Sequence, residues 1–255
     1  MSIKQKNAGP YSLVLVRHGE TEWNGQDRFT GWTDIDLTEH GALQARKAGQ
    51  VLAREGWSFD MAYTSLLRRA ILSQWLMLEE LKQSWVPLQH DWRLNGRHYG
   101  DLTGKLRTEA ARIYGHQEVL HWCRSYCGQP PAIPGGDARD AILDRRYAHV
   151  SPWRLPRTES LRAVVSRVNE FWLQVVRPAT VSGQRVIVCA HGSVIRALIK
   201  ILDGISEYEA AQLNVPNGIP LIYWFDHDMK PTCRCYLEVD SAGDVDLPGS
   251  RRQAC

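Results

Sequence analysis

The chain lacks the cysteine spacings of a metal site or of a disulfide framework. Its six cysteines form no Cys-x-x-Cys pair and no zinc-binding pattern, which favours reduced, partly buried thiols of the kind found in cytoplasmic proteins. Residues 1–10 are polar, and no apolar run is long enough to span a bilayer. We therefore expect no signal peptide, no membrane segment and a cytoplasmic location.

A strong excess of charge of one sign is also lacking. The 31 lysines and arginines nearly balance the 28 aspartates and glutamates, for a net charge of +3, and no polybasic run occurs. This balance argues against a nucleic-acid partner, although a local arginine cluster can still bind a small anion. No cluster of carboxylates suggests a metal site, so no metal is expected. With 255 residues, the chain fits one α/β domain with a substantial core.

An unbroken aliphatic run, residues 13–16, stops abruptly at Arg17, His18 and Gly19. Such a run is typical of a strand that is covered on both faces, as in parallel sheets flanked by helices. Ligands collect at the carboxyl ends of these strands, which is where His18 stands. Gly19 allows the backbone to turn tightly and to approach a ligand closely.

The same order of features recurs far downstream. The apolar run Arg185–Ala190 delivers His191 and Gly192, and a helical pattern follows over Val194–Leu202. A single histidine at such a point can also be a simple cap of a strand or helix, but two strand-His-Gly units in one chain favour a reaction site. Imidazole suits nucleophilic chemistry because its ordinary pKa of about 6.5 leaves much of it neutral near neutral pH.

The remaining periodicity predicts alternating helices and strands. A helix capped by Thr38 is expected to end before Gly56, and a strand is expected over 61–64. The next helix is expected to be capped by Ser65 and to bury a stripe of apolar residues, namely Leu67, Ile71, Trp75 and Leu78. A long helix from Glu159 that ends before Pro178 and a last strand over 221–225 complete the set. Together they predict a three-layer α/β/α fold with a mostly parallel central sheet.

One long segment, about residues 105–158, interrupts this alternation and contains the proline- and glycine-rich stretch 130–136. Inserts of this size in a compact domain are often functional, so we interpret it as a cap that closes over the pocket. The chain as a whole, residues 1–255, is expected to form a single domain, and the tail over 241–255 is expected to be a mobile end.

Several polar residues are candidates for binding an anion. Arg68 and Arg69 open a predicted helix, where cations are unfavourable unless an anion joins them, although paired arginines can also form a solvated face. Arg97 is a planar donor suited to phosphate or carboxylate, and Tyr99 adds a hydroxyl. The loop over 20–32 is either a surface loop or a phosphate-binding one, in which the candidates are Asn24, Thr30 and Gly31.

These motifs carry a family resemblance. The sequences Arg17-His18-Gly19-Glu20, His191-Gly192, and Trp92-Arg93-Leu94-Asn95 followed by Arg97-His98-Tyr99-Gly100 resemble the histidine phosphatase superfamily. Within that superfamily, the chain is most similar to the cofactor-dependent phosphoglycerate mutase and bisphosphoglycerate mutase branch, from about Tyr11 to Phe225.

The resemblance implies a function and a set of site residues. It makes His18 a nucleophile that is primed by 2,3-bisphosphoglycerate, with Arg17, Arg69 and His191 around the phosphoryl group. Phosphate would then move between the 2- and 3-hydroxyls of glycerate without a metal. The substrate would be a small phosphorylated carboxylic acid, and the assembly a homodimer or homotetramer. The expected binding residues are Asn24, Thr30, Gly31, Arg97, Tyr99, Arg107, Arg124, Gly192 and Asn214.

The chain departs from the family pattern at three positions. Gly96 replaces the glutamate that serves as general acid and base, Cys123 replaces the first of two carboxylate-binding arginines, and Ser193 replaces an asparagine. Losing a general acid typically costs a factor of about 10²–10⁴ in rate.

Three explanations of Gly96 stay open. The chain is a mutase that has lost its acid, or a specialised homologue, or a weakened homologue that only binds phosphorylated metabolites or partners. A specialised homologue would use a substrate with a better leaving group or take its acid from elsewhere. The nearest candidate acids in sequence are Asp101, Glu22 and His98.

Overall fold

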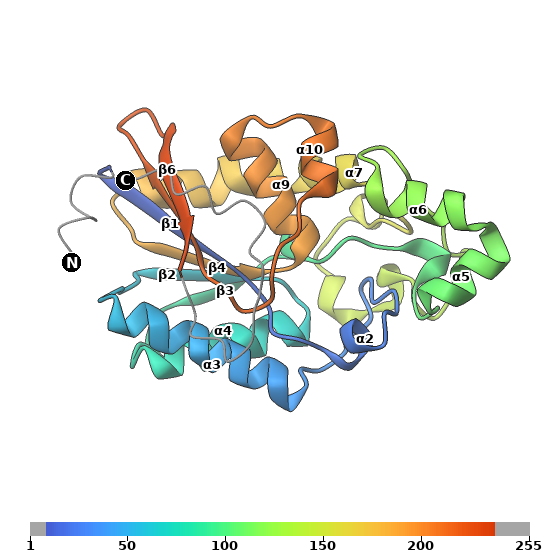
Figure 1. The fold of residues 1–255 in the computed structure, drawn as a ribbon, viewed down its shortest axis with the longest axis horizontal. Coiled ribbons are helices and arrows are strands. Elements are labelled where there is room, and N and C mark those ends of the chain that lie inside the picture. The colour runs from blue at the N-terminus through green and yellow to red at the C-terminus, as the bar shows by residue number, and fades with distance from the viewer. Residues whose placement is uncertain (1–8, 238–255) are drawn as a thin grey trace.

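The computed structural model describes residues 9–237 and contains one six-stranded sheet (Figure 1). The strands are β1 (Tyr11–Arg17), β2 (Met61–Thr64), β3 (Leu88–His90), β4 (Val186–Ala190), β5 (Leu221–Phe225) and β6 (Pro231–Tyr236), in the order β3-β2-β4-β1-β5-β6. The first four in this order pair in parallel, whereas β5 and β6 join the sheet antiparallel. The expected mostly parallel sheet is confirmed.

Helices cover both faces of the sheet. The helices of the described residues are α2 (Glu22–Gly25), α3 (Glu39–Arg54), α4 (Arg68–Glu80), α5 (Arg107–Tyr114), α6 (His116–Arg124), α7 (Leu161–Phe171), α8 (Arg177–Val181), α9 (Gly192–Asp203) and α10 (Glu207–Gln212), of which only some lie against the sheet. Figure 1 shows α3 and α4 on one face and α7, α9 and α10 on the other. The three-layer fold is thus confirmed.

The alternation of side chains along β1 explains these layers. Leu13 and Leu15 join the core cluster that includes α7 and α9, whereas Val14 and Val16 join the cluster that includes α3 and α4. Successive side chains of a strand point to opposite faces. An unbroken aliphatic run is therefore what a strand between two helix layers requires, and all four side chains are at most 1 % exposed.

Two of the expected helix starts are confirmed and one is not. Thr38 caps α3 by accepting a hydrogen bond from the Gly41 amide, and Ser160 caps α7 by accepting one from Ala163. The expectation that Ser65 caps the next helix is wrong, because α4 begins at Arg68 with Leu67 as its N-cap. Instead, the Ser65 hydroxyl accepts a hydrogen bond from the Leu67 amide at 3.2 Å.

The expected apolar stripe of α4 is also partly wrong. Trp75 is 60 % exposed and Ile71 is half-buried, while the polar residues Ser73 and Gln74 are buried. This helix turns a polar face inward because its first two turns border the site rather than the core. Hydrophobicity alone therefore misplaces its inner face.

The remaining differences concern element ends. Pro178 does not end the helix that starts at Leu161, because a five-residue π-helical segment, η6 (Trp172–Val176), leads directly into α8. A proline is tolerated there since the first turn of α8 needs no amide donor from it. The short strand β3 and the edge strand β6 have weak apolar patterns, with exposed and half-buried residues, and were not expected.

The cap segment, residues 105–158, contains α5, α6 and three short 3₁₀ turns, and no strand lies within it. Figure 1 shows α5 and α6 at the end of the molecule toward which β1 and β4 run. Phe29, Leu102, Ala110, Val119 and Trp122 form a separate small core there. The expected mobile tail, 241–255, lies outside the described residues. No helix within residues 9–237 is long and apolar enough to cross a membrane.

Candidate active site

The two histidines meet at one edge of the sheet. β1 and β4 are parallel neighbours with Arg17 paired to Ala190, so the residues that follow both strands emerge side by side. The His18 amide donates to the Ala190 carbonyl at 2.9 Å. The imidazoles of His18 and His191 lie edge to face with ring centroids 4.9 Å apart, and each residue is 4 % exposed.

The hydrogen bond of His18 defines its tautomer. Its Nδ1 lies 2.6 Å from the Gly19 carbonyl oxygen, which can only accept, so Nδ1 carries the proton. Nε2 therefore keeps a free lone pair. Burial, and then the charges of Arg69 and Arg17, hold the pKa of His18 well below its ordinary value. The imidazole is thus neutral near neutral pH, and its Nε2 is chemically able to act as a nucleophile.

A turn between α10 and β5 fixes the backbone at His18. The Asn217 side-chain amide donates to the His18 carbonyl at 2.7 Å, the Gly218 amide donates to the Arg17 carbonyl, and Arg17 Nη1 donates to the Val215 carbonyl. The expected residue of this turn, Asn214, is exposed. The Asn-Gly pair at 217–218 was the available sequence signal for a tight turn.

Ser65 holds the second histidine. Its Oγ lies 2.8 Å from Nε2 of His191 and also accepts the Leu67 amide at 3.2 Å. Since the amide occupies one acceptor position, the hydroxyl proton is available to the imidazole. Burial, followed by the charges of Arg69 and His18, lowers the pKa of His191 well below its ordinary value.

Arg69 is buried between the two histidines and the loop that follows α2. Its guanidinium donates to the carbonyls of Thr33 at 2.8 Å and Gly31 at 3.0 Å, and the residue is 2 % exposed. Burial lowers the pKa of Arg69 to about 10, so it stays charged at neutral pH. Its neighbour Arg68 instead points outward and pairs with Asp36 at 3.0 Å.

Two further guanidinium groups lack full pairing. The Nε atoms of Arg17 and Arg196 are buried and have no hydrogen-bond partner within the part of the chain that the structure describes. Burial and the charge of Arg196 lower the pKa of Arg17 to about 10. Buried donors without acceptors are costly, and two such cations favour an anion between them. Sequence reasoning missed Arg196, although it is a charged residue on the apolar helix that follows His191.

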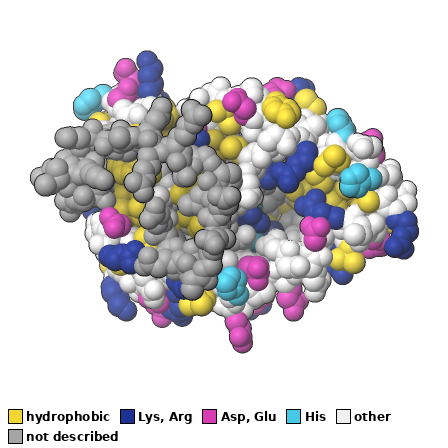
Figure 2. Space-filling model, viewed as in Figure 1, with side chains coloured by type: hydrophobic (Ala, Val, Ile, Leu, Met, Phe, Trp, Pro, Cys, Tyr) yellow, Lys and Arg dark blue, Asp and Glu magenta, His cyan; other side chains and the backbone are white. Residues whose placement is uncertain are grey.

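Further positively charged residues lie near Arg196, toward the cap. Burial lowers its pKa, and the nearby charges of Arg124, Arg97 and Arg107 lower it further. Figure 2 shows basic side chains gathered between the part of the surface formed near α10 and the part formed by the cap. This arrangement suits a ligand with a second anionic group.

The residues expected to bind the substrate differ in what their hydrogen-bond donors contact. Arg97 donates from its three guanidinium nitrogens to the carbonyls of Glu159, Trp122 and Gly128, which ties it to the cap. Its guanidinium also lies 5.3 Å from the centre of the Tyr99 ring.

Two other arginines stand nearer the surface. Arg107 bonds Asp27 at 2.6 Å and Cys123 Sγ at 3.2 Å, and its guanidinium lies 4.7 Å from the centre of the Phe29 ring. Arg124 is exposed at the end of α6. Cys123 thus provides an acceptor for Arg107 where the family pattern has a cation.

The loop after His18 has local roles in the structure. Asn24 forms a reciprocal capping box with Thr21 at the start of α2. Gly31 has a φ of 55°, and a side chain there would crowd Thr103, while its carbonyl serves Arg69. Thr30 is half-buried beside it. Gly192 opens α9, and a Cβ added to it would contact the Arg17 side chain.

None of the three candidate acids is hydrogen-bonded to either histidine within residues 9–237. Asp101 bonds Tyr114, Lys105 and Arg139, and Glu22 is exposed on α2. His98 accepts the Gly100 amide at its Nδ1, and burial lowers its pKa to about 4. Asp101 and His98 therefore have other partners, and Glu22 is exposed to solvent.

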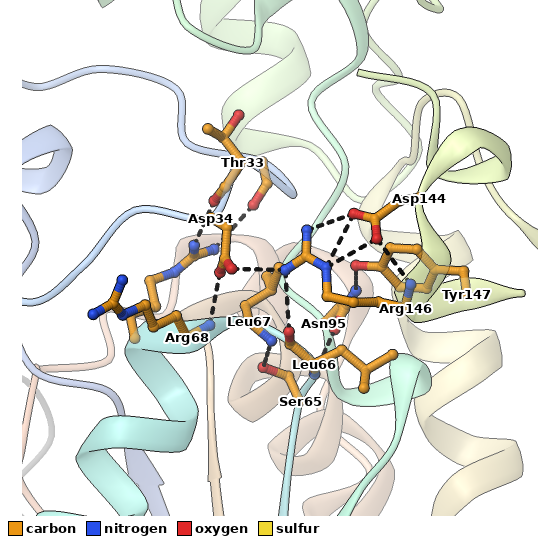
Figure 3. A network of polar contacts seen from close by, with 12 residues as sticks. Thr33, Asp34, Ser65, Leu66, Leu67, Arg68, Asn95, Asp144, Arg146 and Tyr147 are labelled. Atoms are coloured by element: carbon orange, nitrogen blue, oxygen red, sulfur yellow. Dashed lines mark hydrogen bonds and ion pairs between the residues drawn. The ribbon is translucent and has the colours of Figure 1, made fainter. Parts of the chain in front are cut away.

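A polar network joins the cap to the site (Figure 3). Asn95 accepts from the Leu66 amide at 3.0 Å and donates to the Tyr147 hydroxyl at 2.8 Å. Arg146 pairs with Asp34 and Asp144 at 2.8 and 2.6 Å. The cap thereby contacts both sides of the segment that carries Ser65 and Arg69.

Comparison with known proteins identifies the family to which this chain belongs. The family profile of the histidine phosphatase superfamily (branch 1) matches residues 13–147 and 137–230. The chain therefore belongs to this superfamily, whose members are phosphatases and phosphotransferases.

Solved structures share the fold at low sequence identity. A mycobacterial glucosyl-3-phosphoglycerate phosphatase with VO3 is 22 % identical with a TM-score of 0.67, covering 89 % of this chain and 97 % of that one. The α-ribazole phosphatase from Shigella flexneri is 20 % identical with a TM-score of 0.66, covering 92 % and 100 %. The phosphoserine phosphatase from Entamoeba histolytica, in complex with 3-phosphoglyceric acid, is 19 % identical with a TM-score of 0.65, covering 90 % and 98 %.

Proposed function

We propose that the protein transfers the phosphoryl group of a small phosphorylated carboxylic acid through a phosphohistidine at His18. The observation that carries this proposal is the free lone pair on His18 Nε2, in a buried site where Arg17, Arg69 and His191 converge. Similar structures are named for phosphatases of phosphoserine and of glucosyl-3-phosphoglycerate, which supports a substrate of this size and charge.

The chemistry needs positioning and charge more than covalent assistance. Nε2 of His18 attacks phosphorus, the bond from phosphorus to the ester oxygen breaks, and its electron pair leaves with that oxygen. Arg17 and Arg69 stabilise the charge on the equatorial oxygens, with His191 as an additional donor. Water or a second hydroxyl group then takes the phosphoryl group from His18.

A more specific version of this proposal is the mutase activity that the resemblance implies. Interconversion of 2- and 3-phosphoglycerate needs a group that exchanges protons with both hydroxyls, and Gly96 provides none. We therefore expect slow exchange, and phosphoryl release to water as the main outcome. This favours the specialised phosphatase over the efficient mutase.

The priming compound, 2,3-bisphosphoglycerate, fits the residues present. Its phosphates carry two separated negative charges, and the unpartnered Nε atoms of Arg17 and Arg196 lie in a region with further arginines toward the cap. When bound, it would supply the phosphoryl group that His18 accepts. Assembly as a homodimer or homotetramer stays a prediction that gel filtration with light scattering tests.

The experiment begins with labelled 2,3-bisphosphoglycerate and 3-phosphoglycerate as separate donors. We expect an acid-labile, base-stable phosphohistidine in the wild-type protein and in His40→Ala, an exposed-histidine control, and none in His18→Ala. Release of inorganic phosphate indicates a phosphatase, and 2-phosphoglycerate formed from 3-phosphoglycerate indicates a mutase. Binding of both compounds without any phosphohistidine would leave a binding protein and contradict the proposal.

A further inference from the structure

Gly96 is packed directly against the second histidine. A Cβ at Gly96 would lie 3.4 Å from Nδ1 of His191 and only 3.2 Å from its Cγ, and the second distance is shorter than an ordinary van der Waals contact. The φ of Gly96 is outside the left-handed region, so backbone conformation does not require glycine here. A side chain at this position would instead require the His191 imidazole to shift by a few tenths of an ångström.

The segment that carries Gly96 is held in this place. Its carbonyl accepts from Trp32 Nε1 at 2.6 Å and from Arg167 Nη2 at 3.1 Å, and the next amide, that of Arg97, donates to Ser193 Oγ at 3.0 Å. Arg167 is itself paired with Glu159 at 2.7 Å in the interior. Three contacts thus fix the glycine against His191 and leave it little room to retreat.

The groups around the histidines stabilise negative charge but are poor proton donors. Arg17, Arg69 and Arg167 are cations that act on the pKa of His191, and a guanidinium does not release its proton near neutral pH. Within residues 9–237, no carboxylate is hydrogen-bonded to His18 or His191, and the nearby buried Glu159 is committed to Arg167 and the His98 amide. The hydrogen-bond partners of the two imidazoles among these residues are a backbone carbonyl and a hydroxyl, neither of which is an acid near neutral pH.

Resting on the proposed function, we infer that the protein acts on phosphates whose leaving oxygen needs no proton, such as acyl phosphates of small carboxylic acids. His18 Nε2 forms the bond to phosphorus as the bond to the acyl oxygen breaks, and the electron pair remains on a carboxylate. Water then attacks the phosphohistidine, the nitrogen–phosphorus bond breaks back to neutral imidazole, and the proton of water leaves with inorganic phosphate.

The basicity of the leaving oxygen explains why we infer this class of substrate. A carboxylate has a conjugate-acid pKa of about 4, whereas water, the simplest model of an alkyl hydroxyl, has a pKa of about 15.7. A departing alkoxide is therefore a strong base that requires a general acid. A departing carboxylate requires only the positive field that Arg17 and Arg69 provide.

The test measures how the rate depends on the leaving group. Single-turnover phosphorylation of His18 is followed with acetyl phosphate, 4-nitrophenyl phosphate, phenyl phosphate and 3-phosphoglycerate. For the wild-type protein, we expect the rate to fall steeply in this order, by about 10³-fold or more from the first to the last. Gly96→Glu is expected to raise the rate with 3-phosphoglycerate by about 10²-fold and to change the rate with acetyl phosphate less than tenfold.

Gly96→Ala is the matched control, because it adds the same Cβ against His191 without a carboxyl group. It is expected to lower all four rates by a similar factor. Equal wild-type rates for acetyl phosphate and 3-phosphoglycerate would overturn the inference while leaving the phosphohistidine mechanism intact. Absence of phosphohistidine with all four donors would overturn both. The wild-type series decides the question even where Gly96→Glu does not fold.

Discussion

Ser65 and His191 are joined by a hydrogen bond of 2.8 Å between Oγ and Nε2. The serine follows β2 and the histidine follows β4, two strands that pair in parallel. The amide of Leu67 holds the serine oxygen from the other side. The orientation of the second imidazole is therefore set by a neighbouring strand rather than by its own helix.

Replacing Ser65 by alanine tests this contact. We expect the rate of His18 phosphorylation to fall roughly tenfold, because a lost hydrogen bond of about 1 kcal/mol leaves His191 without a fixed orientation. The nitrogen resonances of His191 should move as well, which a purely structural role would not cause. Ser182→Ala, at an exposed helix end, is the control, and an unchanged rate and spectrum in Ser65→Ala would contradict the assignment.

Arg69→Gln should raise the pKa of His18. Burial is the main cause of the lowered value and Arg69 the second, so removing the guanidinium should restore only part of the shift and leave the pKa below about 6.5. Titration by nuclear magnetic resonance in the absence of ligand measures this directly. Arg68→Gln removes the exposed neighbour that pairs with Asp36 and should leave the titration of His18 unchanged.

Tyr147→Phe tests the connection between the cap and the site. The variant removes the acceptor of the fully buried Asn95 side-chain amide, and an unsatisfied buried donor costs about 1–3 kcal/mol. Urea unfolding should show this loss in Tyr147→Phe and not in Tyr208→Phe, whose ring is 75 % exposed. A loss below a few tenths of a kcal/mol would show that the network carries little energy.

Glu159→Gln should be the most destabilising of these changes. It leaves the Arg167 guanidinium charged and buried without its 2.7 Å partner, for which a cost of about 3–5 kcal/mol in unfolding free energy is typical. Glu170→Gln breaks more exposed pairs with Arg93 and Arg154 and should cost about 1 kcal/mol or less. Equal losses in the two variants would disprove a special role for the buried pair.

Stability should decline as the pH falls from about 6.5 toward 4, in part because of His98. Its pKa of about 4 in the folded protein lies below the ordinary 6.5, so the unfolded chain binds the proton first and unfolding is favoured as pH falls through this window. Going from pH 7 to 4.5 should remove about 2–3 kcal/mol through this residue.

The measurement compares urea unfolding at pH 7 and pH 4.5 for the wild-type protein and His98→Asn. The variant keeps a side-chain acceptor for the Gly100 amide, which His98 Nδ1 accepts at 3.0 Å, but cannot titrate, so its pH-dependent loss should be smaller by this amount. His40→Asn alters an exposed histidine and should behave as the wild type. An identical decline in all three proteins would exclude the assignment to His98.

Local patterns were sufficient for the apolar strands β1, β2, β4 and β5 and for the start of α3, but not for the edge strands β3 and β6. Thr38 and Ser160 cap helices because their hydroxyls reach amides three residues away. The pattern over Leu67–Leu78 failed because the polar face of α4 is buried against the site, which no local periodicity reveals. The Asn-Gly turn at 217–218 was visible, but its contact with His18 was not.

By itself, the sequence determined that two buried strands end in histidine and glycine, and that one of the two histidines follows an arginine, because each of these features lies within a few consecutive residues. It also placed a glycine at position 96. The tertiary structure alone decided that the imidazoles meet at 4.9 Å, that Ser65 and Asn217 hold them, and that Gly96 faces His191. Those contacts join segments far apart in the chain, and only the strand order and register of the folded sheet bring such segments together.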